Sequence, residues 1–340
     1  MAATRDLRRD APAYHGGDLT AAGNLFPGAP EPWLDLSTGI NAVPYPVGVL
    51  SAAAFSRLPE AAEISALEHA AAEFFGLSAS AEAVAAPGTQ SLINWLPRLF
   101  SARTFGVLGF AYAEHELVWA ASGAEVRICD TIDELAECDG AVVVNPNNPD
   151  GRLLPANELA ALARRMGGQG KRLIVDEAFI DFLPREKSLA PFLPLPGLIV
   201  LRSFGKTFGL AGLRLGFALA GPDDVALLRA ALGPWAVSGA AVEIGQRAYA
   251  DRAWLAQSAA RLERDGERLD ALLRDSGFEM IGGTPLFRLA RHEQAQEIFR
   301  RLGADGILTR PFAARPDWLR FGIPAAEADF HRLAEILLRA

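Results

Sequence analysis

The sequence predicts an α/β protein with a large, doubly wound domain built on a mixed sheet and a smaller α+β domain. From about residue 104 on, short apolar runs alternate with helix-length segments, which is the pattern of strands joined by covering helices. Runs such as 141–144 (Ala-Val-Val-Val) show no polar alternation, as expected for strands covered on both faces. After about residue 235 a long Ala/Arg/Glu-rich stretch and then short strands indicate the second domain.

The individual elements follow from these patterns. In the first part we expect strands at 104–109, 124–128, 141–145, 172–176 and 198–201, with helices at 112–122 and 155–167. In the second part we expect a helical stretch at about 240–275, strands near 278–281, 285–290 and 317–322, and a last amphipathic helix at about 325–339. The first 40 residues lack strong periodicity and should wrap onto the small domain. The predicted division is a large domain at 45–230 and a small domain formed by 1–44 and 231–340.

Composition excludes several classes of protein. The 340 residues are half hydrophobic and carry a net charge of -8. A net negative charge does not favour binding to nucleic acid or to an anionic membrane. No run approaches the roughly 18 apolar residues of a membrane span, and Met1–Asp10 is charged without an apolar core, unlike a secretory signal. Cys129 and Cys138 are too few for a disulfide framework and match no zinc spacing, so no metal is expected. These features predict a cytoplasmic protein.

Lys206 is the most informative residue, because it closely follows the apolar run 198–201. Burying an ammonium group without a partner is costly, so the pKa of this lysine should fall, and an uncharged amine forms an imine with an aldehyde. Ser203 lies three residues before it and Arg214 eight residues after it, and both side chains suit a phosphate. The predicted cofactor is therefore pyridoxal 5'-phosphate (PLP), an aldehyde that carries a phosphate. Taken alone, Lys206 is better explained as a solvated lysine in a glycine-rich loop, since most lysines are solvated, and the rest of the chain overturns that interpretation.

Two more strand ends add polar side chains. Asp176 ends a buried strand, where the protonated pyridine nitrogen of PLP would supply the cation that its carboxylate needs; the alternative is an Asp that caps the next turn. Asn148 lies in the turn 145–151, and its amide can donate to the cofactor's ring oxygen, although alone this stretch is only a turn. Ligands gather outside the carboxyl ends of strands in such folds, so Asn145, Asp176 and 203–206 should converge.

A glycine before a helix marks a further candidate site. Gly88, Thr89 and Gln90 precede the apolar stretch 91–96, and the first N–H groups of a helix are free to bind a phosphate. As a motif this is weak, because many loops have the same composition. Tyr112, just after the strand at 104–109, can lie flat on the cofactor ring, with packing in the core as the alternative.

The combination of motifs resembles a known family. Asn-Asn-Pro-x-Gly (147–151), then Asp-Glu-Ala-Phe (176–179), then Ser-x-x-Lys (203–206) with Arg214, resembles fold-type I PLP enzymes of the class I/II aminotransferase superfamily over about residues 80–220. His-Gly-Gly (15–17) and Asp-Leu-Ser-Thr-Gly-Ile-Asn (35–41) are similar to the N-terminal signature of threonine-phosphate decarboxylases of cobalamin biosynthesis, close relatives of histidinol-phosphate aminotransferases. The resemblance then spans nearly the whole chain and implies a homodimer.

For the cofactor, the resemblance implies a role for each motif. Lys206 would hold the Schiff base, Asp176 would pair with the pyridine nitrogen, and Tyr112 would stack on the ring, which makes these three the expected catalytic residues. Asn148 would bond the ring oxygen. The phosphate would be held by Ser203, Arg214 and the amides of Gly88, Thr89 and Gln90.

For the substrate, the resemblance points to the two ends of the chain. Arg320 matches the small-domain arginine that clamps the α-carboxylate, and bidentate pairing makes arginine the right residue type for that role. Asn41 would sit beside it. His15 and Arg310 are candidates for the substrate's own phosphate, with a structural histidine as the alternative for His15.

Three residues depart from the common pattern of the superfamily. Phe179 stands where many of its aminotransferases place a tyrosine, and the cobalamin decarboxylases are similar to this chain in having Phe there. Leu58, between Arg57 and Pro59, replaces a tyrosine that reaches the neighbouring subunit's cofactor phosphate in relatives. Asp150 replaces the usual Thr and is expected to be a turn variation.

The resemblance implies decarboxylation of L-threonine O-3-phosphate to (R)-1-aminopropan-2-yl phosphate and carbon dioxide. An aminotransferase that acts on histidinol phosphate or a similar amino phosphate is the second interpretation. A PLP-binding protein without catalysis is the third. Decarboxylation and transamination start alike. The choice between them depends on which bond of the substrate is aligned with the ring, a difference of about an ångström.

Overall fold

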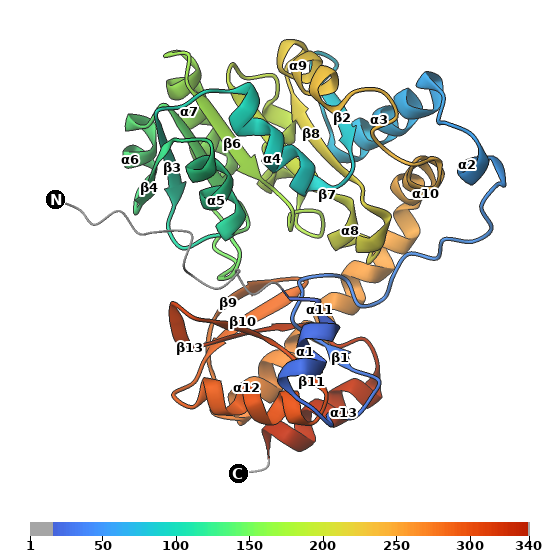
Figure 1. Ribbon diagram of the computed structural model, residues 1–340, viewed down its shortest axis with the longest axis vertical. Helices are drawn as coiled ribbons and strands as arrows, with labels where there is room; N and C mark the ends of the chain where they lie inside the picture. The colour runs from blue at the N-terminus through green and yellow to red at the C-terminus, as the bar shows by residue number, and fades with distance from the viewer. Residues whose placement is uncertain (1–15, 339–340) are drawn as a thin grey trace.

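The protein is described here by a computed structural model that covers residues 16–338, and Figure 1 shows a broad upper domain joined to a narrower lower one. Met1–Asp10 and His15, which entered the sequence-based expectations, lie outside the described residues. Within 16–338 no helix is long and apolar enough to cross a membrane, and no group of three or more His, Cys, Asp or Glu side chains is arranged to hold a metal ion.

The large domain is built on a seven-stranded sheet with the order β2-β8-β7-β6-β5-β3-β4. β8 runs antiparallel to both of its neighbours, while β7, β6, β5, β3 and β4 pair in parallel. The predicted α/β class with a mixed sheet is therefore confirmed. The strands are β2 (Glu82–Ala86), β3 (Thr104–Leu108), β4 (Glu125–Cys129), β5 (Gly140–Val144), β6 (Arg172–Asp176), β7 (Leu198–Ser203) and β8 (Gly216–Ala220).

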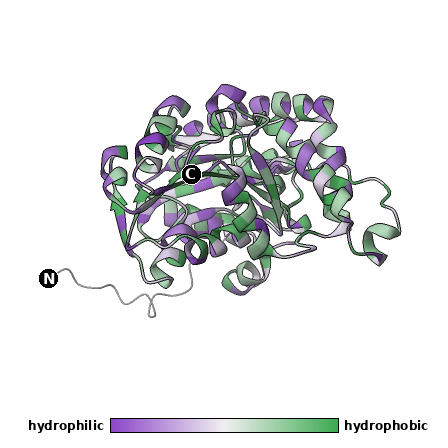
Figure 2. Cartoon of the chain, turned by 90° about the horizontal axis from the view of Figure 1, so that it is seen from above, coloured by the Kyte–Doolittle hydropathy of each residue, from purple (hydrophilic) through white to green (hydrophobic). Residues whose placement is uncertain are grey.

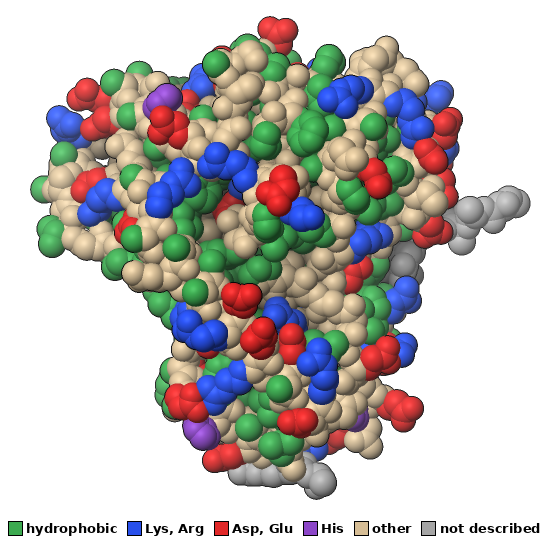
Figure 3. All heavy atoms as spheres, turned by 180° about the vertical axis from the view of Figure 1, so that it is seen from behind, with side chains coloured by type: hydrophobic (Ala, Val, Ile, Leu, Met, Phe, Trp, Pro, Cys, Tyr) green, Lys and Arg blue, Asp and Glu red, His purple; other side chains and the backbone are tan. Residues whose placement is uncertain are grey.

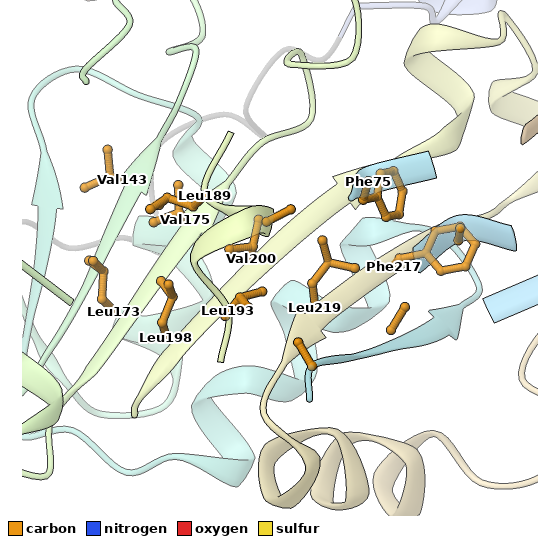
Figure 4. Packing of buried hydrophobic residues seen from close by; sticks show 14 of the residues in the cluster. Phe75, Val143, Leu173, Val175, Leu189, Leu193, Leu198, Val200, Phe217 and Leu219 are labelled. Atoms are coloured by element: carbon orange, nitrogen blue, oxygen red, sulfur yellow. The ribbon is translucent and has the colours of Figure 1, made fainter. Parts of the chain in front are cut away.

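Helices cover both faces of this sheet. One face packs against α3 (Ala61–Phe75), α6 (Ile132–Glu137), α7 (Ala156–Gly167) and α10 (Gly239–Ala250), and the other against α4 (Thr89–Leu99), α5 (Ala113–Ala121) and α9 (Pro222–Leu232). Val143, Val175 and Val200 belong to the first core, shown in Figure 4. Their neighbours Val142 and Ile174 belong to the second. Burial on both faces explains why these strands read as unbroken apolar runs.

The register of the parallel strands brings their carboxyl ends together. Val144 of β5 pairs with Asp176 of β6, and Asp176 pairs with Leu201 of β7. The turn 145–151 and the short helix α8 (Phe204–Thr207) therefore begin side by side at one edge of the sheet. This edge faces the small domain in Figure 1.

The small domain is an α+β unit, as predicted. Its four-stranded antiparallel sheet has the order β12-β13-β10-β9, and the parallel pair β1–β11 joins the N-terminal segment to it. The strands are β1 (Leu34–Asp35), β9 (Glu279–Thr284), β10 (Phe287–Arg291), β11 (Ile307–Leu308), β12 (Arg310–Phe312) and β13 (Arg315–Gly322). The helices are α1 (Leu19–Leu25), α11 (Arg252–Asp275), α12 (Ala295–Ala304) and α13 (Glu327–Leu337).

The expected single helical stretch at 240–275 is two helices, α10 and α11. Asp251 separates them, and its side chain accepts a hydrogen bond from Trp254 N, which makes it the N-cap of α11. Val242 and Tyr249 of α10 belong to the core of the large domain. The packing therefore differs from the predicted division at residue 231, because the chain leaves the large domain only at about residue 251.

Residues 44–60 form an arm at the edge of the large domain, on the right of Figure 2, and the hydroxyl of Ser51 on it donates to Glu243 of α10 at 3.0 Å. The arm contains the one-turn helix α2 (Ala53–Ser56), which lies against α10. Val49 and Phe55 on it are 91% and 72% exposed. In the view of Figure 3 hydrophobic side chains appear at the edge of the molecule that carries the arm, while charges of both signs are interspersed over the rest of that face.

Candidate active site

Lys206 lies on α8, a helix of four residues that directly follows β7. Burial, together with the positive charges of Arg320 and Arg214, lowers the pKa of Lys206 to about 8, while Asp176 acts in the opposite direction. The Lys206 amine lies 5.6 Å from the centre of the Phe179 ring. An appreciable fraction of this amine is therefore uncharged near neutral pH, which is the form that attacks an aldehyde.

Asp176 is held at the end of β6 by two hydrogen bonds. Its Oδ2 lies 3.0 Å from Nε2 of His115, and its Oδ1 accepts from the backbone N–H of Ala178 at 3.1 Å. His115 is fully buried on α5. The carboxylate is thus fixed in direction at the edge of a pocket where a cationic ring nitrogen can meet it.

The start of α4 and the side chain of Arg214 lie against each other. Gly88 is the N-cap of α4, has a positive φ of 83°, and a Cβ at this position would lie 2.6 Å from Arg214 Nη2. A side chain there would push the guanidinium from this position, and the positive φ also favours glycine. Because the first N–H groups of a helix have no partner within it, this corner combines amide donors with a cation, and Ser203 lines the same pocket.

Tyr112 stands at the N-cap of α5, and its hydroxyl donates to Oε1 of Gln90 at 3.2 Å. Burial and the nearby carboxylates of Glu114 and Asp176 raise the pKa of Tyr112 to about 12. The hydroxyl therefore stays protonated across the physiological range. Gln90 also donates to Glu114 at 3.1 Å, so its side chain is engaged with α5 and only its backbone N–H is left for a phosphate.

The structure brings the nine predicted cofactor residues to one cavity, which we call the lysine pocket. Asp176 and Ser203 end strands that lead to it, Lys206 lies on the helix that follows β7, and Phe179 and Leu215 add apolar surface. The nine are Gly88, Thr89, Gln90, Tyr112, Asn148, Asp176, Ser203, Lys206 and Arg214.

A second cavity, the arginine pocket, shares Tyr112, Asn148, Phe179 and Lys206 with the first. Arg320 of β13 and Arg310 of β12 line it, together with Gly16, Ser37, Thr38, Phe110 and Phe312. His15, the residue before Gly16, is outside the described residues, so its predicted substrate contact has no structural counterpart here.

Arg320 is a buried cation, with 7% of the residue exposed, whose hydrogen-bond acceptors are neutral. It donates to Oδ1 of Asn148 and, at 2.8 Å, to the backbone oxygen of Ser37. Among the residues of the described range no acceptor is found for its Nε. Burial and the neighbouring Arg310 lower the pKa of Arg320 to about 9. An incoming carboxylate would relieve this unfavourable setting by pairing with the guanidinium.

Asn41 is engaged with the segment that carries Lys206. It is buried but lines neither pocket, and its Nδ2 donates to the backbone oxygen of Thr207 at 3.0 Å, while its Oδ1 accepts from Arg261 of α11. Its backbone N–H donates to the oxygen of Lys206 at 2.9 Å. The polar atoms of Asn41 thus hold the turn that carries Lys206, and its predicted place beside the substrate carboxylate stays a prediction.

Residues 37–337 match the family model described as aminotransferase class I and II. The chain belongs to this family. The predicted resemblance is thus confirmed, and so is the cofactor, since class I and II aminotransferases depend on PLP. The lysine pocket fits that group, because it joins a buried amine of lowered pKa, a fixed carboxylate, and a corner of amides and a guanidinium cleared by Gly88.

The relatives of this chain include threonine-phosphate decarboxylases and histidinol-phosphate aminotransferases. The chain is 43% identical over 331 residues to a threonine-phosphate decarboxylase of Sinorhizobium sp, covering 97% of this chain and 98% of the relative. A threonine-phosphate decarboxylase of Pseudomonas aeruginosa is 40% identical, with 95% and 97% covered. A histidinol-phosphate aminotransferase of Thermobifida fusca is 31% identical, with 95% and 91% covered.

Among solved structures, histidinol-phosphate aminotransferase from Sinorhizobium meliloti in complex with PLP has the same fold. Its TM-score to this chain is 0.83 at 22% identity, with 99% of this chain and 98% of that chain covered. This likeness confirms the predicted fold-type I architecture of a class I and II aminotransferase. It extends over both domains of the described chain.

His115 is a residue of the site that the sequence does not predict. It occurs inside helix α5, three residues after Tyr112, where a single histidine has no pattern that distinguishes it from a core residue. Its place in the first turn of the helix that follows Tyr112 indicates only that it lies near the sheet edge. The hydrogen bond to Asp176 appears only once α5 and β6 are placed in the fold.

Proposed function

We propose that this aminotransferase-family protein is a PLP-dependent decarboxylase that converts L-threonine O-3-phosphate to (R)-1-aminopropan-2-yl phosphate and carbon dioxide, a reaction of cobalamin biosynthesis. The observation that carries the proposal is the near full-length similarity, at 43% and 40% identity, to proteins named threonine-phosphate decarboxylase. The relative named histidinol-phosphate aminotransferase is more distant, at 31%. Phe179, the position where the decarboxylases resemble this chain, lines both pockets beside Lys206.

For the cofactor we assign the nine residues of the lysine pocket. Lys206 would hold PLP through its amine, Asp176 would pair with the ring nitrogen, and Tyr112 would cover the ring. Arg214 and the amides at the start of α4 would hold the phosphate. When bound, PLP supplies an electron sink, because its ring takes up the electron pair left when a bond to the substrate α-carbon breaks.

For the substrate we assign the arginine pocket. Arg320 would bind the α-carboxylate, because it is a buried guanidinium whose present acceptors are neutral oxygens. Arg310 lines the same pocket and would bind the distal phosphate of the substrate. Lys206 lines both pockets, so its amine is placed to hold a proton and return it to the α-carbon after carbon dioxide leaves.

We further propose a homodimer located in the cytoplasm. The arm at 44–60 supports the dimer, because Val49, Phe55 and Leu58 expose apolar side chains on it and a second copy of the chain would cover them. Both cysteines are free thiols, which is usual for proteins of a reducing compartment. Fractionation of cells that express the native gene would test the location.

The test of the reaction uses the purified, PLP-loaded protein with L-threonine O-3-phosphate and no keto acid, followed by mass spectrometry. We expect an aminopropanol phosphate that is lighter than the substrate by one carbon dioxide. The second candidate, an aminotransferase, is favoured by the relative from Thermobifida fusca. Absence of that product, together with conversion of histidinol phosphate once 2-oxoglutarate is added, would establish the aminotransferase instead.

A further inference from the structure

A group of buried polar side chains lies behind the lysine pocket, and the proposed reaction does not use it. Its members are Glu177, Asp181, Arg202 and Thr207, and we call it the buried ionic group. Glu177, Arg202 and Thr207 are 1%, 4% and 1% exposed. Because side chains alternate along a strand, Arg202 points away from the face to which its neighbour Ser203 points.

The contacts within the buried ionic group form a chain. Nη1 of Arg202 donates to Oε2 of Glu177 at 3.1 Å, and its Nη2 donates to Oδ1 of Asp181. The other oxygen of Asp181, Oδ2, accepts the hydroxyl of Thr207 at 2.6 Å. The guanidinium carbon of Arg202 lies 4.2 Å from the centre of the Phe75 ring, which closes the group on the side of the core.

Three members of the group are adjacent in the sequence to residues that we assign to the cofactor. Glu177 follows Asp176, Arg202 precedes Ser203, and Thr207 follows Lys206. In addition, the backbone oxygen of Arg202 accepts the hydroxyl of Thr89 at 3.1 Å, which ties the start of α4 to β7. The hydrogen bonds of the group therefore restrain the backbone beside each of these positions.

The turn that carries Lys206 depends most on such restraints. α8 has four residues, and a helix of that length is not stable in isolation. Asn41 binds the carbonyl oxygens of Lys206 and Thr207, and Asp181 binds the Thr207 hydroxyl. Asp181 is itself held by Arg202, which lies on a central strand of the sheet.

We propose that Asp181 and Thr207 are positioning residues for Lys206, and that the hydrogen bond between them holds α8 in a fixed position relative to β7. The inference rests on the role of Lys206 in the proposed function. Thr207 acts by its hydroxyl, because the hydroxyl is the group that joins α8 to the carboxylate. Removing it leaves Asp181 paired with Arg202, so no buried charge loses its partner.

The test compares two substitutions of Thr207 in the full-length, PLP-loaded protein. Thr207→Val keeps the shape of the side chain and removes the hydroxyl, whereas Thr207→Ser keeps the hydroxyl. Thr309→Val is the matched control, because Thr309 is equally buried in the small domain and its hydroxyl has no partner among residues 16–338. Thr207→Ala repeats the test should Thr207→Val not fold.

Three measurements follow for each variant: kcat and KM, the induced circular dichroism of the bound cofactor, and the rate at which an amine-selective acylating reagent labels Lys206 in the apoprotein. For Thr207→Val we expect kcat to fall about ten- to hundredfold, with KM within about twofold, because a misplaced reacting group costs rate more than binding. The dichroism and labelling rate should change with it. Thr207→Ser and Thr309→Val should match the wild type.

Wild-type dichroism and labelling in folded Thr207→Val would overturn the proposal, whatever the value of kcat. Equal changes in Thr309→Val would also overturn it, because they would show a general effect of the substitution. The labelling of apoprotein does not depend on the reaction that the enzyme catalyses. Failure of the decarboxylase assignment therefore leaves this test able to decide.

Discussion

The amine of Lys206 is subject to opposing influences from its neighbours. Burial, Arg320 and Arg214 all favour the neutral amine, and Asp176 favours the charged one, with a resulting pKa of about 8. A lysine in water has a pKa of about 10.4 and is almost fully charged at pH 7. The site thus makes this one lysine reactive toward an aldehyde under conditions in which surface lysines are not.

The lowered pKa of Lys206 predicts how cofactor capture depends on pH. Only the neutral amine attacks, so between about pH 6.5 and 7.5 the rate of PLP binding to the apoprotein should rise about tenfold, and above about pH 9 it should level off. Stopped-flow absorbance after mixing measures it. A rate that still climbs tenfold per unit between pH 9 and 10 would show an unshifted lysine. Lys206→Ala should show no visible band of a covalently held cofactor.

Arg320 offers a second test at the scale of a residue. Arg320→Lys keeps a positive charge but loses the planar pair of donors, and a charge-assisted hydrogen bond contributes about 2 kcal/mol, so KM should rise about thirtyfold. Steady-state kinetics with L-threonine O-3-phosphate measures it. Arg291→Lys on the neighbouring strand β10 is the control, because Arg291 pairs with Glu279 at the surface. An unchanged KM in Arg320→Lys would place the carboxylate elsewhere.

Among the elements, the break between α10 and α11 could not be predicted from the sequence pattern. Both helices are rich in good helix formers, and Asp251 between them differs little from the other acidic residues of that stretch. The break becomes visible only through the cap, in which Asp251 accepts from Trp254 N at 2.9 Å. Its position decides where the large domain ends.

This cap predicts a loss of stability when it is removed. Asp251→Ala should destabilise the protein by about 1 kcal/mol, because the N–H of Trp254 loses its acceptor, and the thermal midpoint should fall by about 2 °C. Differential scanning calorimetry measures it. Asp251→Asn retains a capping oxygen and should stay near the wild-type midpoint. Equal midpoints for all three proteins would mean that the cap contributes nothing to stability.

Strands β2 and β8 were not predicted, although β3 to β7 were found close to their observed bounds. β2 reads Glu-Ala-Val-Ala-Ala and β8 reads Gly-Phe-Ala-Leu-Ala, and alanine and glycine are poor indicators of a strand. Their place in the sheet is fixed by pairing, since β8 lies between β2 and β7. Small residues are required there, as a Cβ on Gly216 would lie 2.6 Å from Thr89 N.

The residues of the site show the same division between local and long-range information. Asp176, Ser203 and Lys206 could be predicted because each stands at or just after the end of an apolar strand, and the topology then brings strand ends together. Asp181 and Arg202 could not, because a buried charge next to a pocket residue has no mark in the sequence. Asn41 was assigned by motif alone, and its contact with Thr207 emerges only from the fold.

For the whole molecule, the exposed arm predicts association of two chains. We expect the wild-type protein to sediment as a dimer, and Val49→Glu to raise the dissociation constant at least about a hundredfold, because a carboxylate would be buried without a partner. Ile128→Glu is the control, since Ile128 is half-exposed on β4, at the opposite end of the sheet. Analytical ultracentrifugation measures both. A monomeric wild-type protein would contradict the proposed dimer.

The hydrogen bond between Arg320 and Asn148 joins the two domains, since β13 belongs to the small one and the turn 145–151 to the large one. The guanidinium of Arg320 has five N–H donors and its Nε has no acceptor among residues 16–338, so it can bind a carboxylate while it still donates to Asn148. Substrate binding would therefore add a link through the ligand to the direct link between the domains. The affinity measured at this site then includes the free energy of interdomain attachment. A substitution that weakens the contact between the domains can therefore change the affinity for the substrate without contacting it.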